Sequence, residues 1–100
     1  MKMGKRINAK AKGSRRERQA KKRLEKRSYS VIKSGGSLGA LDLIGFRHYD
    51  IRGIQVKSNR KPPKAEMENL RKLKDRLPLG FKIEVWVYKD RVKEPEVICI

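Results

Sequence analysis

The sequence predicts a small α/β domain in which helices flank a single mixed β-sheet, in the order helix, three strands, helix, two strands. Three observations support this prediction. Apolar residues recur at helical spacing in two segments, they alternate at strand spacing in others, and turns that contain Gly or Pro separate the segments. At 100 residues the chain forms one domain, because neither an internal repeat nor a long linker divides it.

The first helix is predicted to begin at Ser14. The stretch "SRRE" has the form of a capping box, with Ser14 as the N-cap and Glu17 at the third helical position. Ala20 and Leu24 then mark a narrow apolar stripe, and the helix is expected to end near Arg27–Ser28.

The segment before this helix, residues 1–12, has almost no apolar content and is rich in Lys and Arg. We therefore expect a flexible basic N-terminal arm, followed by a folded domain over residues 13–100. The arm is either a solvated tail or a segment that contacts phosphate groups, and its charge alone does not decide between these two roles.

Three strands are predicted over residues 29–34, 40–46 and 51–58. The first two are separated by "GGS" at residues 35–37. The tight connection in "FRHYDIRG" favours a hairpin between the second and third strands. Because side chains alternate along a strand, Gln55 and Lys57 are expected to project from the same face.

The second helix is predicted over residues 64–77, with Pro63 as a favourable first-turn residue. Its apolar face is formed by residues at helical spacing, which are Met67, Leu70, Leu73 and Leu77.

Two further strands are predicted over residues 81–90 and 96–100. In the first of them apolar residues alternate with Lys82, Glu84, Trp86 and Tyr88, which is typical of a half-buried strand. Trp86 and Tyr88 would then lie either in a dimer interface or packed beneath a helix, and we favour the packing.

The composition indicates a polyanionic partner, and nucleic acid is the first candidate. The formal net charge is +17, and residues 1–33 carry 14 basic and 2 acidic side chains. The sequence contains no stretch of about 18 apolar residues for a membrane span, and its N-terminus lacks the apolar core of a secretory signal. We therefore expect a soluble, cytoplasmic protein that does not act at membranes. The lone Cys99 excludes a disulfide framework and a Cys-based zinc site, and the lone His48 argues against a His-rich metal site.

A candidate site emerges where the second and third strands pair. Asp42 lies between Leu41 and Leu43, where a carboxylate is costly to bury unless it is paired or bound to a metal. In a hairpin it shares a face with Gln55 and Lys57, which places two oxygen donors suited to a hard divalent cation beside a lysine. The alternative is an edge strand on which Asp42 simply faces water.

Glu17 is the fourth candidate for this site. As the acid of a capping box its structural role is already complete. However, Glu17 precedes Ala20 by three residues and Leu24 by seven, so it lies on the helix face that meets the sheet. An acid in that place could reach inward toward a metal ion.

Two stretches of this chain resemble the archaeal-type Holliday junction resolvases and their phage and bacterial relatives, which belong to the PD-(D/E)XK nuclease superfamily. The stretches are "KGSRRERQAKKRLEKRSYSVIKSGGSLGALDLI" and "IQVKSNRKPPKAE". The resemblance covers residues 12–66. Beyond them, only the helix-then-strand order and "EVWVYKDR" are similar to the shorter family members.

The resemblance implies a set of site residues. The family combines a helical Glu, a Ser after a Gly turn, a strand Asp and an acid-x-Lys pair, which fall here on Glu17, Ser37, Asp42, Gln55 and Lys57. This chain departs from the family at residue 55, where the family usually has Glu. Gln keeps a carbonyl oxygen that can bind a cation but removes one negative charge, and some nucleases of the superfamily carry Gln here. We interpret this as a variant active site with lower metal affinity.

The implied activity is metal-dependent hydrolysis of DNA at four-way junctions, with Mg²⁺ as the expected ion and Mn²⁺ as the alternative. The expected metal ligands are Asp42, Gln55, the carbonyl of Val56, and Glu17, while Lys57 orients the attacking water or stabilises the developing charge. A symmetric homodimer would match the two strands to be cut in branched double-stranded DNA. Candidate phosphate contacts flank these positions, and they are Arg15, Arg16, Lys21, Lys33, Lys61 and Lys64.

Two other functions stay open at this point. The first is a non-catalytic basic nucleic-acid-binding protein of the ribosomal-protein type, which fits the charge and the size but leaves the grouping of Asp42, Gln55 and Lys57 as a coincidence. The second is a nuclease of the same fold that acts on nicks, ends or other branched DNA.

Overall fold

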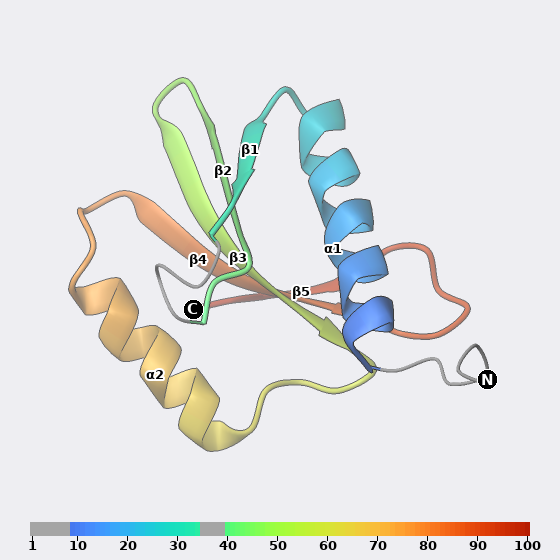
Figure 1. Cartoon of the computed structure of the whole chain (residues 1–100). Helices are drawn as coiled ribbons and strands as arrows, with labels where there is room; N and C mark the ends of the chain where they lie inside the picture. Colours follow the sequence, from blue (N-terminus) through green and yellow to red (C-terminus); the bar gives the residue numbers. More distant parts are fainter. Residues whose placement is uncertain (1–8, 35–39) are drawn as a thin grey trace.

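A computed structural model describes residues 9–34 and 40–100, with side chains described from residue 15 onward. Within these residues two helices and five strands follow one another in the predicted order, and Figure 1 shows their arrangement. The elements are α1 (Ala9–Lys26), β1 (Ser30–Lys33), β2 (Leu43–Arg47), β3 (Asp50–Ser58), α2 (Lys64–Asp75), β4 (Phe81–Tyr88) and β5 (Glu96–Cys99). No helix in the described part of the chain combines the length and apolar character needed to cross a membrane.

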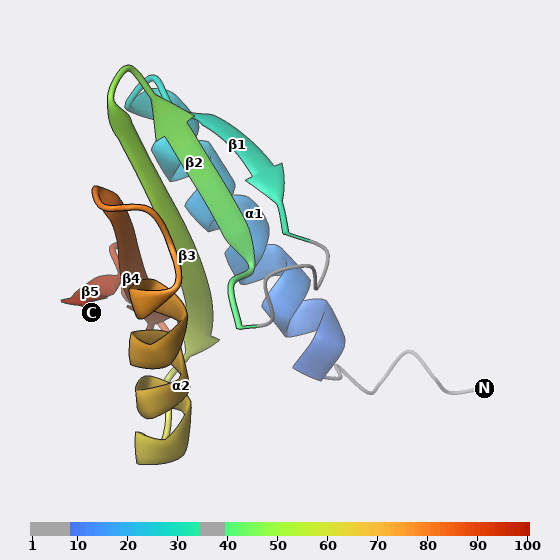
Figure 2. The same ribbon diagram turned by 90° about the vertical axis from the view of Figure 1, so that its left-hand side faces the viewer.

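The five strands form one mixed sheet in the order β1-β2-β3-β4-β5. All neighbouring strands are antiparallel except β3 and β4, which are parallel and are joined through α2. Figures 1 and 2 show α1 and α2 on opposite faces of this sheet. The β2–β3 hairpin is confirmed, with Arg47 opposite Asp50 at its tip. The predicted fold class is therefore confirmed.

The start of the first helix was predicted wrongly. Helix α1 begins at Ala9, so Ser14 lies inside the helix and is not its N-cap. The alternating Ala and Lys residues before Gly13 are good helix formers, and they extend the helix through the apparent capping box. The helix therefore starts within the segment predicted as a basic arm. Residues 1–8 lie outside the described residues, so the arm itself stays a prediction.

Helix α1 covers one face of the sheet with the apolar stripe that the sequence predicts. Ala20 and Leu24 are buried against Leu43 of β2, Ile54 of β3 and Trp86 of β4. These residues recur on one side of each element because of helical spacing in α1 and strand alternation in the sheet. This packing fixes the helix across the three central strands.

Helix α2 covers the other face, and its buried Leu70 packs in a cluster with Leu41, Ile83 and Val85. Strand β4 is therefore buried on both sides, and the prediction of a half-buried strand is wrong. The reason is its central position between β3 and β5 with a helix on each face. Trp86 and Tyr88, which are 2% and 1% exposed, pack on the α1 side and are not surface residues.

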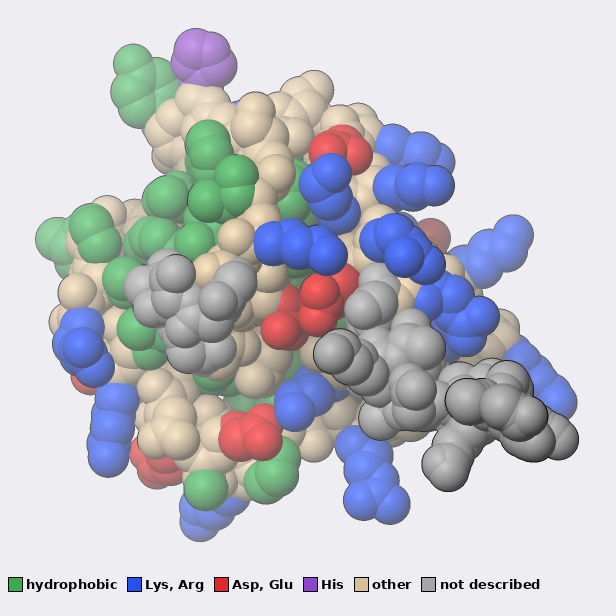
Figure 3. Space-filling view, viewed as in Figure 1, with side chains coloured by type: hydrophobic (Ala, Val, Ile, Leu, Met, Phe, Trp, Pro, Cys, Tyr) green, Lys and Arg blue, Asp and Glu red, His purple; other side chains and the backbone are tan. Residues whose placement is uncertain are grey.

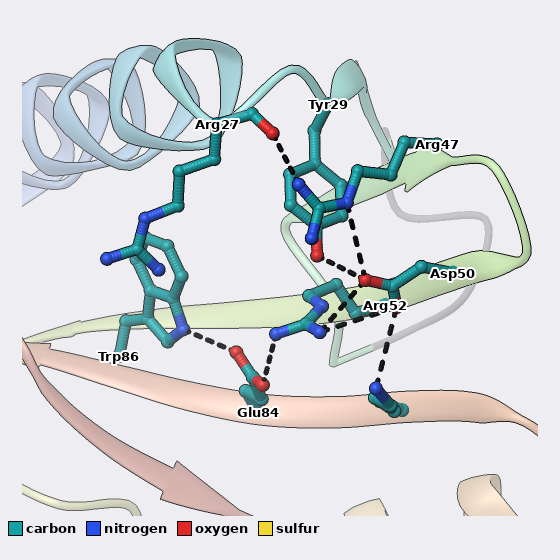
Figure 4. Close-up of polar contacts among 8 residues, drawn as sticks. Arg27, Tyr29, Arg47, Asp50, Arg52, Glu84 and Trp86 are labelled. Carbon is teal, nitrogen blue, oxygen red and sulfur yellow. Dashed lines mark hydrogen bonds and ion pairs between the residues drawn. The ribbon is translucent and has the colours of Figure 1, made fainter.

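A network of polar side chains joins the end of α1 to the β2–β3 hairpin and β4 (Figure 4). We call it the hairpin network, and it consists of Tyr29, Asp50, Arg52, Glu84 and Trp86. The Tyr29 hydroxyl donates to Asp50, and the Arg52 guanidinium donates to Asp50 at 3.0 Å and to Glu84 at 2.8 Å. The Trp86 indole N–H donates to the other Glu84 oxygen at 2.9 Å. Each carboxylate of the network thus accepts hydrogen bonds from the Arg52 cation and from a neutral donor, which is Tyr29 for Asp50 and Trp86 for Glu84.

The hairpin network lowers the pKa of Asp50. The largest cause is the hydrogen bond from Tyr29, followed among the favourable contributions by the hydrogen bond and charge of Arg52. A lowered carboxyl pKa means that the folded state stabilises the ionised form, so the network contributes to folding stability at neutral pH.

Candidate active site

Asp42 lies directly before β2, which begins at Leu43 rather than at the predicted residue 40. Its backbone still bonds to both neighbouring strands. The Asp42 N–H donates to the carbonyl of Ile54 at 2.8 Å, and its carbonyl accepts from the N–H of Ser34 at 3.0 Å. The residue is therefore held in register opposite β3 even though the regular strand starts one residue later.

The residues on either side of Asp42 anchor it to both faces of the sheet. Leu43 is buried in the α1 cluster, whereas Leu41 is buried in the α2 cluster. Leu41 packs directly on Gly53, where an added Cβ would lie 2.5 Å from the Leu41 Cδ1 atom. Gly53 thus allows the chain at Asp42 to approach β3 closely, and this packing fixes the position of the carboxylate.

The Asp42 carboxylate is half-buried and points toward β3. Its Oδ2 atom accepts a hydrogen bond from the backbone N–H of Val56 at 2.7 Å. Burial nevertheless raises its pKa, although the Val56 hydrogen bond and the positive charge of Lys57 act in the opposite direction. The folded protein therefore holds this acid in an environment that disfavours its charge.

Glu17 approaches Asp42 from α1. Its pKa is raised, first by burial and then by the negative charge of Asp42, while Lys33 acts to lower it. The two half-buried carboxylates thus repel each other, and a bound cation would relieve this repulsion. Because the helix begins at Ala9, Glu17 is free of the capping role considered from the sequence.

Gln55 lies on β3 next to these acids, and it is only 7% exposed. Its side-chain oxygen Oε1 is buried without a hydrogen-bond partner in the described part of the chain. The same is true of the Ser34 hydroxyl at the end of β1, a residue that the sequence reasoning missed. Buried oxygen atoms without partners are rare in proteins because each one loses its bonds to water, so they indicate a site built for a ligand.

Lys57 projects on the same face of β3 as Gln55, as strand alternation predicts, and it contacts helix α2. Its Nζ atom lies 2.9 Å from Oε1 of Glu66, in the first turn of that helix. The sequence reasoning missed Glu66. The available signal was an acid that closely follows "KPP", because Pro63 starts α2 after a short connection from the strand that carries Lys57.

These side chains fit a hard divalent cation better than a soft metal. No group of three His, Cys, Asp or Glu side chains that could hold a metal ion occurs among residues 15–34 and 40–100. The available donors are the carboxylates of Asp42 and Glu17 and the unpartnered oxygen of Gln55. An all-oxygen set with two negative charges suits Mg²⁺ or a similar ion and excludes a thiolate or imidazole site.

Basic side chains gather near acidic ones on one face of the molecule (Figure 3). Figure 3 shows acidic side chains near the middle of one face, with Lys and Arg around them. Of the predicted phosphate contacts, four are exposed, and these are Arg15, Lys33, Lys61 and Lys64.

The remaining predicted contacts are already engaged, and one predicted residue is not described. Arg16 is 8% exposed and bonds to Gln19 and Asp90, so it serves mainly to fix α1 to the end of β4. Lys21 pairs with Glu25 at 3.3 Å on the surface of α1. The predicted Ser37 lies outside the described residues.

Residues 8–77 match the family model for the archaeal Holliday junction resolvase (Hjc). No curated protein matches the chain. Among solved structures, Hjc of the hyperthermophilic archaeon Archaeoglobus fulgidus, a Holliday junction resolvase, is similar in fold. It shares 22% sequence identity with a TM-score of 0.70, over 88% of this chain and 72% of the other. The chain therefore belongs to the archaeal Holliday junction resolvase family, whose members are structure-selective endonucleases.

Proposed function

We propose that this protein resolves four-way DNA junctions by hydrolysing phosphodiester bonds at the site formed by Asp42, Gln55 and Lys57. The observation that carries this proposal is the unpartnered, buried oxygen of Gln55 beside a carboxylate whose pKa is raised. Folding stability alone does not account for this pairing, because both features disfavour the folded state in the absence of a ligand.

In this proposal Asp42, Gln55 and Glu17 hold a divalent cation together with the carbonyl of Val56, and Mg²⁺ is the ion that the oxygen donors favour. Such an ion would lower the pKa of an attacking water and neutralise charge on the phosphoryl group. The hydrogen bond from the Val56 N–H fixes Oδ2 of Asp42, which directs the carboxylate toward the site.

Lys57 positions the water or stabilises the charge that develops on the phosphate. Glu66 acts through Lys57, because its carboxylate holds the ammonium group at 2.9 Å. A lysine on four flexible bonds loses less conformational entropy on reaching the transition state when a partner already restricts it. Glu66 also supplies a negative charge to the site, where Gln55 lacks one.

DNA binding is proposed to rest on the exposed Arg15, Lys33, Lys61 and Lys64, and on the basic segment before α1. These cations neutralise phosphates of the arms and release counterions, which makes affinity steeply dependent on salt. Because the junction is intracellular DNA, we place the protein in the cytoplasm, as expected from the sequence.

We further propose that the protein acts as a homodimer with one site per subunit. Three exposed apolar side chains lie on neighbouring strands, namely Ile32 of β1, Phe46 of β2 and Ile51 of β3. Strand register places them on one face, because Ile32 lies opposite Ile44 and Phe46 lies opposite Ile51. A second copy that covers this face would hold two active sites at a fixed separation on a two-fold junction. Sedimentation of Phe46→Lys should then show monomers where the wild type is dimeric.

The decisive experiment compares a labelled four-way junction with a linear duplex of the same sequence, with Mg²⁺ and with a chelator. We expect the junction to be cut only when Mg²⁺ is present, and to be bound in both conditions. Cleavage that is equal on both substrates would instead indicate a nuclease without junction selectivity. If the protein binds the junction but does not cut it in Mg²⁺ or in Mn²⁺, it is a non-catalytic nucleic-acid-binding protein.

A further inference from the structure

A second polar site lies on the other flank of helix α1. It is a pocket of about 240 Å³, which is several times the ~30 Å³ that a water molecule occupies in the liquid. Helix α1, the end of β4 and the segment between β4 and β5 form its lining, which consists of Gln19, Lys22, Arg23, Lys26, Tyr88 and Lys93. None of these residues belongs to the candidate active site or to the phosphate contacts predicted from the sequence.

Helical geometry separates this pocket from the active site. Each residue turns an α-helix by 100°, so Arg23 lies about 120° around the axis from Glu17. The buried stripe of Ala20 and Leu24 lies between them and faces the sheet. One flank of α1 therefore presents Glu17 toward Asp42, while the opposite flank presents the pocket.

The pocket is strongly cationic. Three of its basic side chains come from α1, and Lys93 adds a fourth from the segment after β4. Glu94 contacts this lining, with its carboxylate 3.7 Å from Arg23 and its side chain 76% exposed to solvent. An ion pair this exposed is weak and is readily displaced, so the pocket keeps an excess of positive charge.

One residue of the lining, Tyr88, carries a buried hydrogen-bond donor without a partner among the described residues. Tyr88 is 1% exposed, and its hydroxyl oxygen is buried without a hydrogen bond to any described residue. The pKa of Tyr88 is raised by burial, with opposing contributions from Arg23 and Arg16, so the hydroxyl stays protonated and lies near cationic groups. A buried hydroxyl without a partner destabilises the fold, which favours a role in ligand binding.

We propose that this pocket binds a backbone phosphate of a DNA arm. Lys22, Lys26 and Lys93 neutralise the charge of the phosphate. The Tyr88 hydroxyl, which is covered in the unbound protein, donates to a phosphate oxygen once the side chains of the lining move aside. Arg23 then exchanges Glu94 for the phosphate. This inference rests on the proposed function, because it takes DNA as the partner. In this proposal one flank of α1 faces the candidate active site, and the opposite flank binds a DNA arm.

The test measures affinity for a four-way junction in a chelator, so that neither metal nor cleavage enters. The double variant Lys26→Ala/Lys93→Ala is compared with Arg71→Ala/Lys72→Ala, which removes the same charge from exposed positions of α2. Losing one phosphate contact should make the slope of log K against log salt shallower by about 0.9, and weaken binding about eightfold at 0.1 M salt. The α2 variant should change both quantities much less. Equal effects of the two double variants would overturn the proposal.

A neutral substitution tests the hydroxyl separately. Tyr88→Phe should weaken junction binding several-fold without changing the salt slope, because no charge is lost. Its thermal stability should be equal to or higher than that of the wild type, since the unpartnered hydroxyl is removed. Tyr49→Phe, at an exposed hairpin position, is the matched control and should bind as the wild type does. Normal binding by Tyr88→Phe would contradict the assigned donor.

The pocket could instead bind a free phosphate ion. Titration with inorganic phosphate at constant ionic strength distinguishes this ligand from a phosphate of the DNA backbone. If the pocket variants lose phosphate binding but bind the junction normally, the pocket serves a free anion and the proposal is wrong. If the wild type binds no DNA at all, the proposed function itself fails. If the wild type binds the junction and the pocket variants bind it equally well, the pocket proposal is wrong while the proposed function still stands.

Discussion

The hairpin network and the candidate active site use similar side chains but satisfy them differently. In the hairpin network Asp50 and Glu84 each receive hydrogen bonds from charged or polar donors, and Arg52 joins them. In the active site one oxygen of Asp42 is bonded to a backbone N–H, whereas Oε1 of Gln55 is buried without a partner among the described residues. Strand β3 contributes to both groups.

The two aspartates show the difference most directly. The pKa of Asp50 is lowered, chiefly by the Tyr29 hydrogen bond, whereas the pKa of Asp42 is raised by burial. The fold therefore favours the charge on Asp50 and disfavours it on Asp42. A polar group that is buried at a cost to stability is a better functional candidate than one whose partners are complete, even when both are charged.

The largest effect is expected from Lys57→Ala. Removing the positive charge beside Asp42 should lower the cleavage rate at least about 100-fold, in the range found when a stabilising donor is deleted from an active site. The free energy of unfolding should change by less than about 1 kcal/mol, because the Lys57–Glu66 ion pair is partly exposed. Single-turnover cleavage and chemical denaturation measure these quantities. Cleavage at the wild-type rate would show that Lys57 does not take part in the reaction.

A smaller loss is expected from Glu66→Ala, about tenfold in the cleavage rate, because Lys57 is then less restricted. Glu68→Ala is the matched control, since it removes an exposed acid from the same helix. A role in positioning Lys57 predicts that the pH dependence of cleavage changes only in the Glu66 variant, and that Glu66→Asp restores part of the rate. Identical pH profiles for the two Ala variants would exclude this role.

Gln55→Glu sharpens the comparison by adding a third acid to the site. The Mg²⁺ concentration for half-maximal cleavage should fall several-fold, because charge is restored at the same distance from the ion. Without a divalent ion the variant should be less stable than the wild type, since the new carboxylate lies near Asp42 and Glu17. Melting curves with and without Mg²⁺ test this, and Gln55→Ala should need more Mg²⁺ than the wild type. If both variants need the same Mg²⁺ concentration as the wild type, Gln55 is not a metal ligand.

The smallest effect is in the pH dependence of stability. Asp42 and Glu17 have raised pKa values, so their ionisation opposes folding, and stability should rise as the pH falls from neutral through those values. Asp50 has a lowered pKa, so its contribution should persist above the ordinary value of 3.8 and be lost at lower pH. Urea denaturation of the wild type and Asp42→Asn as a function of pH should show that the rise is smaller in the variant. The same rise in both proteins would contradict the raised pKa of Asp42.

The sequence predicted the fold well because its elements are marked by local patterns. The stripe of Ala20 and Leu24 and the hairpin at residues 46–53 were predicted from spacing alone, and both are confirmed. The start of α1 was not, since a capping-box pattern at Ser14 cannot show that the preceding residues also form a helix. Packing of Trp86 and Tyr88 beneath a helix, which was favoured over a dimer interface, is confirmed. Strand alternation alone did not reveal that both faces of β4 are covered.

The candidate site could be predicted only where strand pairing dictates it. The expected hairpin places Asp42 against the stretch of β3 that carries Gln55 and Lys57, while the roles of these residues stay a prediction. Glu66 was missed because its contact with Lys57 depends on the path of the chain between β3 and α2, which leaves no periodic signal. The hairpin network was missed for a similar reason, since its members come from separate elements and meet only after the sheet has formed.

The central claim is that Asp42 serves the reaction and Asp50 serves the fold, and one paired measurement tests it. Asp42→Asn and Asp50→Asn each remove one carboxylate charge and keep the shape of the side chain. We predict that Asp42→Asn lowers junction cleavage at least about 100-fold with an equal or higher free energy of unfolding. Asp50→Asn should lower that free energy by about 1–3 kcal/mol and keep cleavage per folded molecule near the wild-type rate. The account is contradicted if Asp42→Asn cuts normally, or if it loses stability as Asp50→Asn does.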